Sequence, residues 1–425
     1  MATLQTLAAT IADKAAEITR ILDSKGLAQP QLSEAGIDDF AGIDYELRDA
    51  RNALIRAGLD AVRLAQGPED QVLTLAWSAA DAANLSTIVR FNIAGQVPPS
   101  GQISAVDLAA ATGLDADVLA RVVRYAIGNG IFYEPEPAVF AHTASSALLG
   151  RNEHLRDIVS LSSDDMVRVI SRQGETLQRQ QEDPANAPAT AFNVAFPDYA
   201  HVFEYFSKNP EVGRRYHNYL LGRVHTSRWS VDHLTSCWDW PAIGGGTVVD
   251  VGGSSGHTCA ALARVCPNAK FVIEDVNPDA LVKGRELLSA DADVFRRTTF
   301  VIHDFFTPQS VEGDVYIFRH IFHDWSDEDT VKILNNLLPA LKPGARVLVS
   351  EGLVPDPPAR RTGCLDERLI LLEDMFMLGV HAGRERSAAD FARLFTQVSP
   401  KFALKGVTGG RQGEFQSLME FVYQP

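Results

Sequence analysis

Apolar residues recur at spacings of three and four near the start of the chain. Leu4, Leu7 and Ile11 follow this spacing, which places apolar side chains on one face of an α-helix. The pattern continues less regularly to about residue 93 and predicts a helical region, interrupted at 28–44 by a linker rich in glycine, proline and acids. These helices carry apolar stripes that the segment is too short to bury on every side, so we expect them to need partners.

The segment 103–140 has the order of elements found in a winged helix. A helical run ends at Gly113, a second run follows, and two short apolar runs then indicate a hairpin. The second helix carries only Arg121 and Arg124, which are few charges for a helix that has to neutralise DNA phosphates. We therefore expect the first domain, residues 1–150, to pair two subunits in a homodimer rather than to bind DNA.

Residues 151–240 are predicted to connect this domain to the next. A polar stretch at 175–188 indicates the end of a helix and an exposed loop. Aromatic residues then gather, Phe196 and Phe203 among them. Such a cluster either forms core or walls a pocket for a flat apolar substrate, and the sequence leaves both interpretations open.

Strand and helix patterns alternate in the third part, residues 241–425, as is typical of a parallel doubly wound sheet. The last two apolar runs have no helix between them and predict a hairpin at the sheet edge. The fold class is therefore α/β, a Rossmann-like doubly wound sheet preceded by a mainly helical winged-helix domain. The predicted strands are 248–251, 271–273, 299–302, 315–318 and 346–350, and the hairpin runs are 402–407 and 414–423.

Composition indicates a globular protein and limits its partners. The 425 residues are 46% apolar and 22% charged, and we expect no apolar run near the roughly 20 residues of a membrane span. The net charge of −15 opposes binding to nucleic acid. The four cysteines show no Cys-x-x-Cys pair, so neither a metal site nor a disulfide framework is expected. We expect a cytoplasmic protein that binds neither nucleic acid nor a membrane.

The β-branched run 248–251 breaks into glycines and then into a helix-compatible stretch. Gly252, Gly253 and Gly256 permit a tight turn, and the N–H groups at the start of the following helix would face a polar ligand. Asp275 ends the next apolar run, about where an acid that binds the hydroxyl pair of a ribose is expected. The spacing is not that of the dinucleotide fingerprint, which would need another glycine inside the strand.

An acid two residues before the first glycine, Asp250 before Gly252, resembles the S-adenosylmethionine (SAM) loop of class I methyltransferases. That loop usually reads acid-x-Gly-x-Gly-x-Gly. Ser254 replaces its middle glycine here, and adds a side chain where the methionine part of SAM is expected to pass.

Further strand ends bring polar residues to the same rim, because ligands of doubly wound sheets lie at the carboxyl ends of the strands. Asp304 and Phe305 follow the third strand, Arg319 and His320 follow the fourth, and Glu351 follows the fifth. The run His323-Asp324-Trp325-Ser326-Asp327 resembles the signature of plant and fungal small-molecule O-methyltransferases. Later runs resemble that family in the same order: Lys342-Pro343-Gly344, Glu373-Asp374-Met375-Phe376-Met377 and Gly383-Arg384-Glu385-Arg386-Ser387.

The resemblance covers nearly the whole chain and implies roles for single residues. It implies that His323 is the general base and that Glu351 and Glu385 orient and polarise its ring. It also implies that Asp275 holds the ribose, that Asp304 and Phe305 contact the adenine, and that Gly252 lies against the methionine moiety. The other expected cofactor-binding residues are Asp250, Gly253, Ser254, Gly256 and Arg319, the last standing where the family usually has lysine. The expected pocket residues are Phe196, Phe203, His320, Asp324, Asp374 and Met377.

Each of these residues also has a structural interpretation. His323 alone would more often bond its own backbone, Asp324 would cap the following helix, and Glu385 between two arginines would belong to a solvated charge run. The ordered set favours catalysis, since a histidine of pKa about 6.5 can take the proton of a phenol of pKa about 10 as its oxygen attacks a methyl group.

The resemblance thus implies an enzyme that uses SAM to methylate a hydroxyl of a small aromatic or polyketide-like molecule, with S-adenosylhomocysteine as product. One alternative is a methyltransferase-like lyase, isomerase or pericyclase that binds SAM without consuming it. Ser254 and Arg319, which depart from the family pattern, favour this alternative. Another is a winged-helix regulator that binds DNA.

Overall fold

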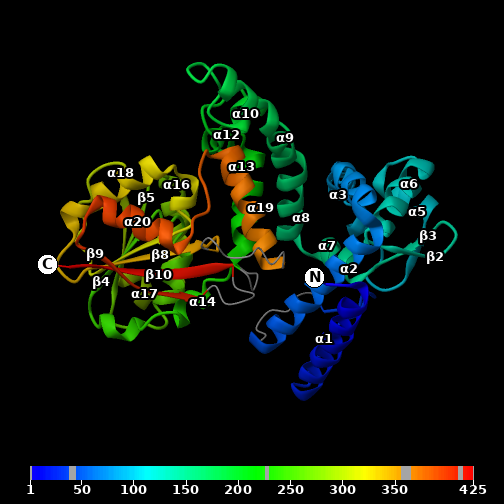
Figure 1. Cartoon of the computed structure of the whole chain (residues 1–425), viewed down its shortest axis with the longest axis horizontal. Helices are drawn as coiled ribbons and strands as arrows, with labels where there is room; N and C mark the ends of the chain where they lie inside the picture. The colour runs from blue at the N-terminus through cyan, green and yellow to red at the C-terminus, as the bar shows by residue number, and fades with distance from the viewer. Residues whose placement is uncertain (1, 38–44, 225–228, 356–364, 410–414, 425) are drawn as a thin grey trace. The chain divides into compact units, whose positions relative to one another are not determined.

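The computed structural model describes residues 2–37, 45–224, 229–355, 365–409 and 415–424. The chain divides into two compact units, Met1–Ser227 and Arg228–Pro425. The first unit is mainly helical, and the second is built on a seven-stranded sheet (Figure 1). Most of the predicted connecting region, residues 151–240, belongs to the first of these units.

Long helices open the first unit, as the apolar spacing predicts. They are α1 (Leu4–Ser24), α2 (Tyr45–Trp77) and α3 (Ala79–Arg90). The apolar stripe of α1 buries Ile18, Ile21 and Leu22, which pack against Leu47 and Ala50 of α2. Of the predicted linker, residues 38–44 lie outside the described residues.

One stretch, Glu46–Arg90, is long and apolar enough to pass a length-and-composition test for a membrane-crossing helix, and only 6% of its most apolar part is buried. By that test, the expectation that no such segment exists is wrong. Gly67 interrupts the stretch with φ 75° and ψ 171°, and Pro68 follows it. A single helix of this kind is weak evidence for a membrane, because apolar surface is also covered by protein partners.

The predicted winged helix is present, with one strand that the sequence did not indicate. α5 (Ala105–Thr112) ends at Gly113, which has φ 74°, and α6 (Ala116–Gly128) leads into the hairpin of β2 (Tyr133–Glu136) and β3 (Val139–Ala141). The additional strand β1 (Gln102–Ser104) pairs with β3. It is short because Ser104 accepts a hydrogen bond from the Asp107 N–H and so caps α5.

In the rest of the first unit, a buried acid, Asp165, links residues of separate helices. Asp165 lies in a π-helical turn, accepts a 2.7 Å hydrogen bond from the Tyr205 hydroxyl and pairs with Arg215 at 3.1 Å. The elements of this region are α4 (Ile93–Gln96), α7 (Ala144–Arg151), α8 (Glu153–Ser160), the π-helix Leu161–Met166, α9 (Val167–Ile170), α10 (Gln173–Glu182), α11 (Ala191–Ala195), α12 (Val202–Lys208) and α13 (Pro210–Val224).

The second unit is the predicted doubly wound sheet. Its strand order is β6-β5-β4-β7-β8-β10-β9, and β6 through β8 run parallel. The strands are β4 (Thr247–Val251), β5 (Lys270–Asp275), β6 (Thr298–Ile302), β7 (Val315–Arg319), β8 (Arg346–Gly352), β9 (Phe402–Gly409) and β10 (Gln416–Tyr423). The chain reverses its direction of travel across the sheet between β4 and β7, which is where such sheets bind ligands.

Successive residues of the strands point to opposite faces of the sheet and pack into two separate core layers. Val248 and Ile317 face a layer that includes Leu262 of α15 (His257–Leu262), whereas Val249 and Phe318 face a layer that includes Phe391 of α20 (Ala388–Val398). Helices therefore flank the sheet on both faces (Figure 1). The remaining elements are α14 (Asp232–Ser236), the 3₁₀ turn Trp240–Ile243, α16 (Pro278–Leu288), α17 (Ala292–Arg296), the 3₁₀ turn Phe322–Asp324, α18 (Asp327–Leu337), the 3₁₀ turn Leu338–Ala340 and α19 (Leu365–Val380).

The last two strands form the predicted hairpin at the sheet edge. β10 pairs antiparallel with both β8 and β9, so it lies between them and β9 is the edge strand. Glu414, the first residue of the second predicted run, lies outside the described residues.

Candidate active site

The glycine-rich turn after β4 has the geometry of a ligand cradle. Gly252 and Gly256 have φ of 72° and 75°, and Ser254 adopts φ 50° in the same left-handed region. That region favours glycine, so the serine is strained there. A Cβ at Gly253 would lie 2.7 Å from the carboxylate of Asp250. The turn therefore brings backbone close to a buried acid, which only glycine permits at that position.

Two acids frame this turn. Asp250 is buried, and burial raises its pKa to about 7, although the Cys259 thiol, 3.6 Å away, donates to it and Arg319 lies near. Asp275 accepts hydrogen bonds from the Ser254 N–H at 2.9 Å and from the Asn277 N–H at 2.8 Å. Burial raises the pKa of Asp275, and these two bonds oppose the shift. Ser254 thus fixes the acid that is expected to hold the ribose.

Asp304, Phe305 and Arg319 have identifiable structural contacts. Asp304 accepts a 2.9 Å hydrogen bond from the Phe306 N–H and so shapes its own turn, while Phe305 packs edge-on against Trp325. Arg319 donates to the Trp229 carbonyl oxygen at 2.8 Å and to the Gln416 side chain at 3.3 Å. Their cofactor contacts stay predictions. The chemistry of the glycine cradle and of the acid at the end of β5 nevertheless fits SAM, because the cradle would allow a close approach of its methionine part and the carboxylate of Asp275 could accept hydrogen bonds from ribose hydroxyls.

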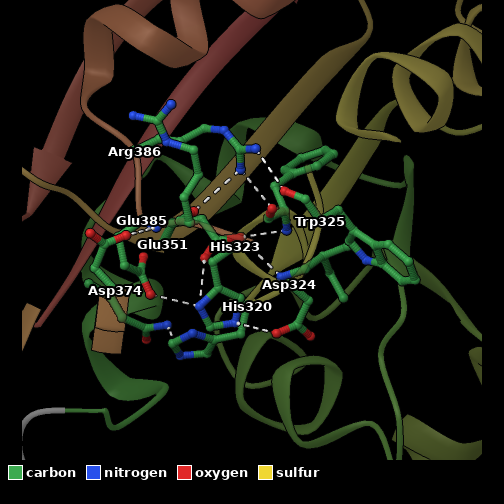
Figure 2. A network of polar contacts seen from close by, with 12 residues as sticks. His320, His323, Asp324, Trp325, Glu351, Asp374, Glu385 and Arg386 are labelled. Carbon is green, nitrogen blue, oxygen red and sulfur yellow. Dashed lines mark hydrogen bonds and ion pairs between the residues drawn. The ribbon is translucent and has the colours of Figure 1, made fainter. Parts of the chain in front are cut away.

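His323 lies in the 3₁₀ turn after β7, surrounded by carboxylates (Figure 2). Its Nδ1 is 2.9 Å from Glu385 Oε1 and 3.9 Å from Glu351 Oε2, and its Nε2 is 3.6 Å from Asp324 Oδ1. The side chain is only 8% exposed. Burial lowers the pKa of His323, but the charges of Glu351, Glu385 and Asp324 outweigh burial and raise it well above its usual value.

The two glutamates hold this turn as well as the ring. Glu351 Oε1 accepts from the N–H groups of Ile321 and Phe322 at 3.0 and 2.9 Å, which fixes the backbone just before His323. Burial raises the pKa of Glu351 to about 7, while His323 opposes the shift. Glu385 is itself buried, and its N–H donates to Asp374 Oδ1 at 2.9 Å. The interpretation of Glu385 as part of a solvated charge run is therefore wrong.

A loop before α20 clamps the turn from the other side. Gly383 lies against the carbonyl oxygen of His323, where a Cβ would overlap that atom, and the Arg384 N–H donates to it at 3.0 Å. The Arg386 guanidinium is fully buried and donates to the carbonyl oxygens of Phe322 and Trp325 at 2.7 and 2.8 Å (Figure 2). In the sequence Arg386 is only one residue of a motif, and its role in holding the base turn becomes evident from its burial in the structure.

His320 lies beside the base but is tied into the sheet edge. It has φ 53°, its Nε2 contacts the Gln416 side-chain amide, and its ring centroid is 5.2 Å from that of His323. His320, His323 and Glu351 offer metal-ligand atoms within 4.8 Å of one another. His323 Nδ1 already lies 2.9 Å from Glu385 Oε1, and the Glu351 carboxylate already accepts two backbone N–H groups through its Oε1, so the arrangement suits acid–base work better than metal binding.

The expected pocket residues fall in both units. Asp324, Asp374 and Met377 surround the base turn within the second unit, where Met377 is 8% exposed. Phe196 and Phe203 belong to the first unit. Phe196 is buried and packs at a tilt against Tyr205 with a centroid distance of 4.6 Å, whereas Phe203 is 38% exposed. Phe196 therefore forms core, and the role of these residues toward a substrate stays a prediction.

The sheet order, the glycine cradle and the histidine between acids define a class I methyltransferase. A family model described as an O-methyltransferase domain matches residues 176–399. The chain is 33% identical over 408 residues to chlorophenol O-methyltransferase of Trichoderma longibrachiatum, covering 94% of this chain and 86% of the relative. It is 31% identical over 420 residues to the grayanic acid biosynthesis cluster O-methyltransferase of Cladonia grayi, covering 99% and 87%.

Among solved structures, CalO1, a methyltransferase in calicheamicin biosynthesis in its SAH-bound form, aligns with a TM-score of 0.64 at 28% identity, covering 84% of this chain and 99% of that one. The chain belongs to the O-methyltransferase family. The predicted fold class and the predicted cofactor, SAM, are thereby confirmed.

Proposed function

We propose that this protein transfers a methyl group from SAM to a hydroxyl of a small aromatic molecule, with His323 as the general base. The observation that carries the proposal is the 2.9 Å contact between His323 Nδ1 and Glu385. A buried carboxylate accepts a hydrogen, so Nδ1 carries the proton in the neutral ring and Nε2 is left as the basic nitrogen.

The residues around His323 have different roles in the proposed reaction. Glu351 fixes the backbone of the base turn, and Glu385 fixes the tautomer and stabilises the imidazolium that forms when the acceptor gives up its proton. SAM, when bound, supplies a methyl group on a cationic sulfonium. Gly252, Gly253 and Asp275 would hold it beside the turn. Because the pKa of His323 is raised, its ring is mostly neutral, and so able to act as a base, only at a pH above the usual pKa of histidine. We therefore expect activity to rise with pH.

The substrate class is inferred from the relatives and from the sequence. One relative is named for chlorophenol and another for grayanic acid biosynthesis. An aromatic or polyketide-like acceptor of secondary metabolism with an acidic hydroxyl suits a histidine base, because a small pKa difference makes the proton transfer easy.

We also propose a homodimer in the cytoplasm that binds neither nucleic acid nor a membrane. Val72 and Leu75 of α2, three residues apart on one helix face, are each 66% exposed, and a second subunit would cover such a face. Light scattering at micromolar concentration is expected to give a dimer, and a fully active monomer would contradict it. A fluorescent fusion tests the location.

The non-methylating alternative rested on Ser254 and Arg319. Ser254 keeps the left-handed turn and donates its N–H to Asp275, so the substitution preserves the cradle. All three catalytic candidates, His323, Glu351 and Glu385, are in contact. The structure of the site gives no specific support to the alternative.

His323→Ala tests the proposal. The variant is expected to keep the thermal shift that SAM gives, since His323 is not a cofactor ligand, and to lose turnover by roughly 10² to 10⁴-fold. Product is followed with methyl-labelled SAM, together with S-adenosylhomocysteine. Conversion of an acceptor without S-adenosylhomocysteine, and equally well when S-adenosylhomocysteine replaces SAM, would show that methyl transfer is not the reaction.

A further inference from the structure

The carboxylate of Asp324 lies between two histidines. Its Oδ1 is 3.6 Å from Nε2 of His323 and also 3.6 Å from Nε2 of His381. The three side chains are only 8%, 19% and 15% exposed, in the order His323, Asp324 and His381. The nitrogen assigned above as the base therefore faces a carboxylate that a second imidazole also contacts.

The backbone holds His381 in this position. His381 directly follows α19, and its N–H donates to the Met377 carbonyl oxygen at 3.0 Å, as does the N–H of Gly383 at 3.2 Å. Ala382 has φ 57°, which turns the chain sharply after the helix. Gly383 then lies against His323 with no room for a Cβ. The loop that carries His381 thus packs directly on the turn that carries the base.

The charge around the base is unbalanced without His381. Glu351 and Glu385 each have one buried oxygen without a hydrogen-bond partner, and Asp324 adds a third carboxylate. Once Glu351, whose pKa is raised to about 7 by burial, is ionised, one imidazolium at His323 offsets only part of this charge, and the excess favours keeping a proton on the ring that has to release it. His381 stands at the C-terminal end of a 16-residue helix, where a cation is stabilised by the helix dipole.

We propose that His381 is a positioning residue for the base: as an imidazolium it pairs with Asp324 and draws that carboxylate away from His323 Nε2, which leaves this nitrogen able to accept the proton of the substrate hydroxyl. This role rests on the proposed function of His323. The other titratable or charged groups that face the pair come from four elements: His320 from the loop after β7, Glu351 from β8, Asp374 from α19, and Glu385 and Arg386 from the loop before α20.

The test is the pH dependence of kcat/KM in single and double variants. His381→Gln removes the cation, so the Asp324 carboxylate interacts with His323 alone. The acidic limb of the kcat/KM profile, where activity rises as His323 loses its proton, should then move to higher pH by on the order of one unit. Asp324→Asn removes the carboxylate and should move the limb to lower pH. Because His381 acts through Asp324, the double variant should have the limb of Asp324→Asn alone. His381→Arg keeps a cation and should restore most of the wild-type position.

The control is Arg384→Gln in the same loop, whose exposed side chain is screened by solvent and should leave the limb in place. Loss of activity in His381→Gln with an unmoved limb, or an additive shift in the double variant, overturns the proposal and leaves His381 a structural residue.

The readout must also be independent of turnover. Titration of the His323 ring by NMR in the same variants should show a higher pKa in His381→Gln and a lower one in Asp324→Asn. If the wild-type enzyme makes no S-adenosylhomocysteine, the proposed function fails, and the NMR shifts alone decide the coupling. If it makes S-adenosylhomocysteine and His381→Gln leaves both readouts unchanged, only the role of His381 fails.

Discussion

Arg386 offers the sharpest test of how the base turn is held. Its side chain is fully buried, and its guanidinium bonds Asp327 at 2.9 Å as well as the carbonyl oxygens of Phe322 and Trp325. Arg386→Met keeps much of the volume but leaves the two carbonyl oxygens without these donors. Each such group costs about 1–3 kcal/mol, and breaking a buried ion pair costs about 3–5 kcal/mol in other proteins.

In Arg386→Met, Asp327 should lose less than a fully buried ion-pair partner would. Its side chain is 34% exposed and keeps Arg393, which donates to its other oxygen at 2.9 Å. We therefore expect Arg386→Met to lower the free energy of unfolding by about 3–5 kcal/mol in total, with most of the loss at the two carbonyl oxygens. Turnover should fall as well, since these carbonyls flank His323.

Arg393→Met is the matched control, because Arg393 binds the same carboxylate from a side chain that is 53% exposed. Its loss should cost no more than about 1 kcal/mol. Denaturant unfolding followed by tryptophan fluorescence is suited to the comparison, since Trp77 is the one tryptophan of the first unit and the other four lie in the second. Equal midpoints for the two variants, at an unchanged slope, would refute the clamp.

Two further substitutions test the cofactor cradle and the first unit. Asp275→Ala should weaken SAM binding by roughly tenfold or more in calorimetry, since charge-assisted bonds to the ribose are lost, whereas Asp279→Ala, an exposed acid in the first turn of α16, should bind as the wild type does; unchanged affinity in Asp275→Ala removes this acid from the site. Tyr205→Phe removes the 2.7 Å bond to buried Asp165 and should lower the free energy of unfolding of the first unit by about 1–2 kcal/mol. Tyr125→Phe, which loses an exposed bond to Asp81, should change little, and equal losses would contradict the importance of burial.

The sheet could be predicted because its central strands β4, β7 and β8 are buried on both faces and form continuous apolar runs between helical stretches. Each predicted strand lies within one or two residues of β4 to β8. β1 was missed because three residues leave no periodicity. The π-helical turn at Leu161–Met166 was missed because its buried Asp165 depends on a tyrosine 40 positions away.

The candidate site shows the same limit at single residues. Arg384 and Arg386 flank Glu385 and look alike in the sequence, yet Arg384 is exposed and Arg386 is buried. Likewise, nothing in the sequence pairs His381 with Asp324, since their contact depends on how the chain turns after α19. Residue types at strand ends could be predicted, but the distribution of charge among them is set by packing between segments distant in sequence.

That packing also couples the cofactor cradle to the base. A Cβ at Gly252 would lie 2.5 Å from Cδ1 of Ile321, so the glycine turn and the base turn are in contact. Ile321 lies two residues before His323, and its N–H donates a hydrogen bond to Glu351. A side chain at Gly252 would be strained by the positive φ of 72° and would displace the end of the Ile321 side chain. In the proposed reaction, the glycine turn and the base turn would thus hold the methyl donor and the base side by side, a geometry on which the rate of methyl transfer depends.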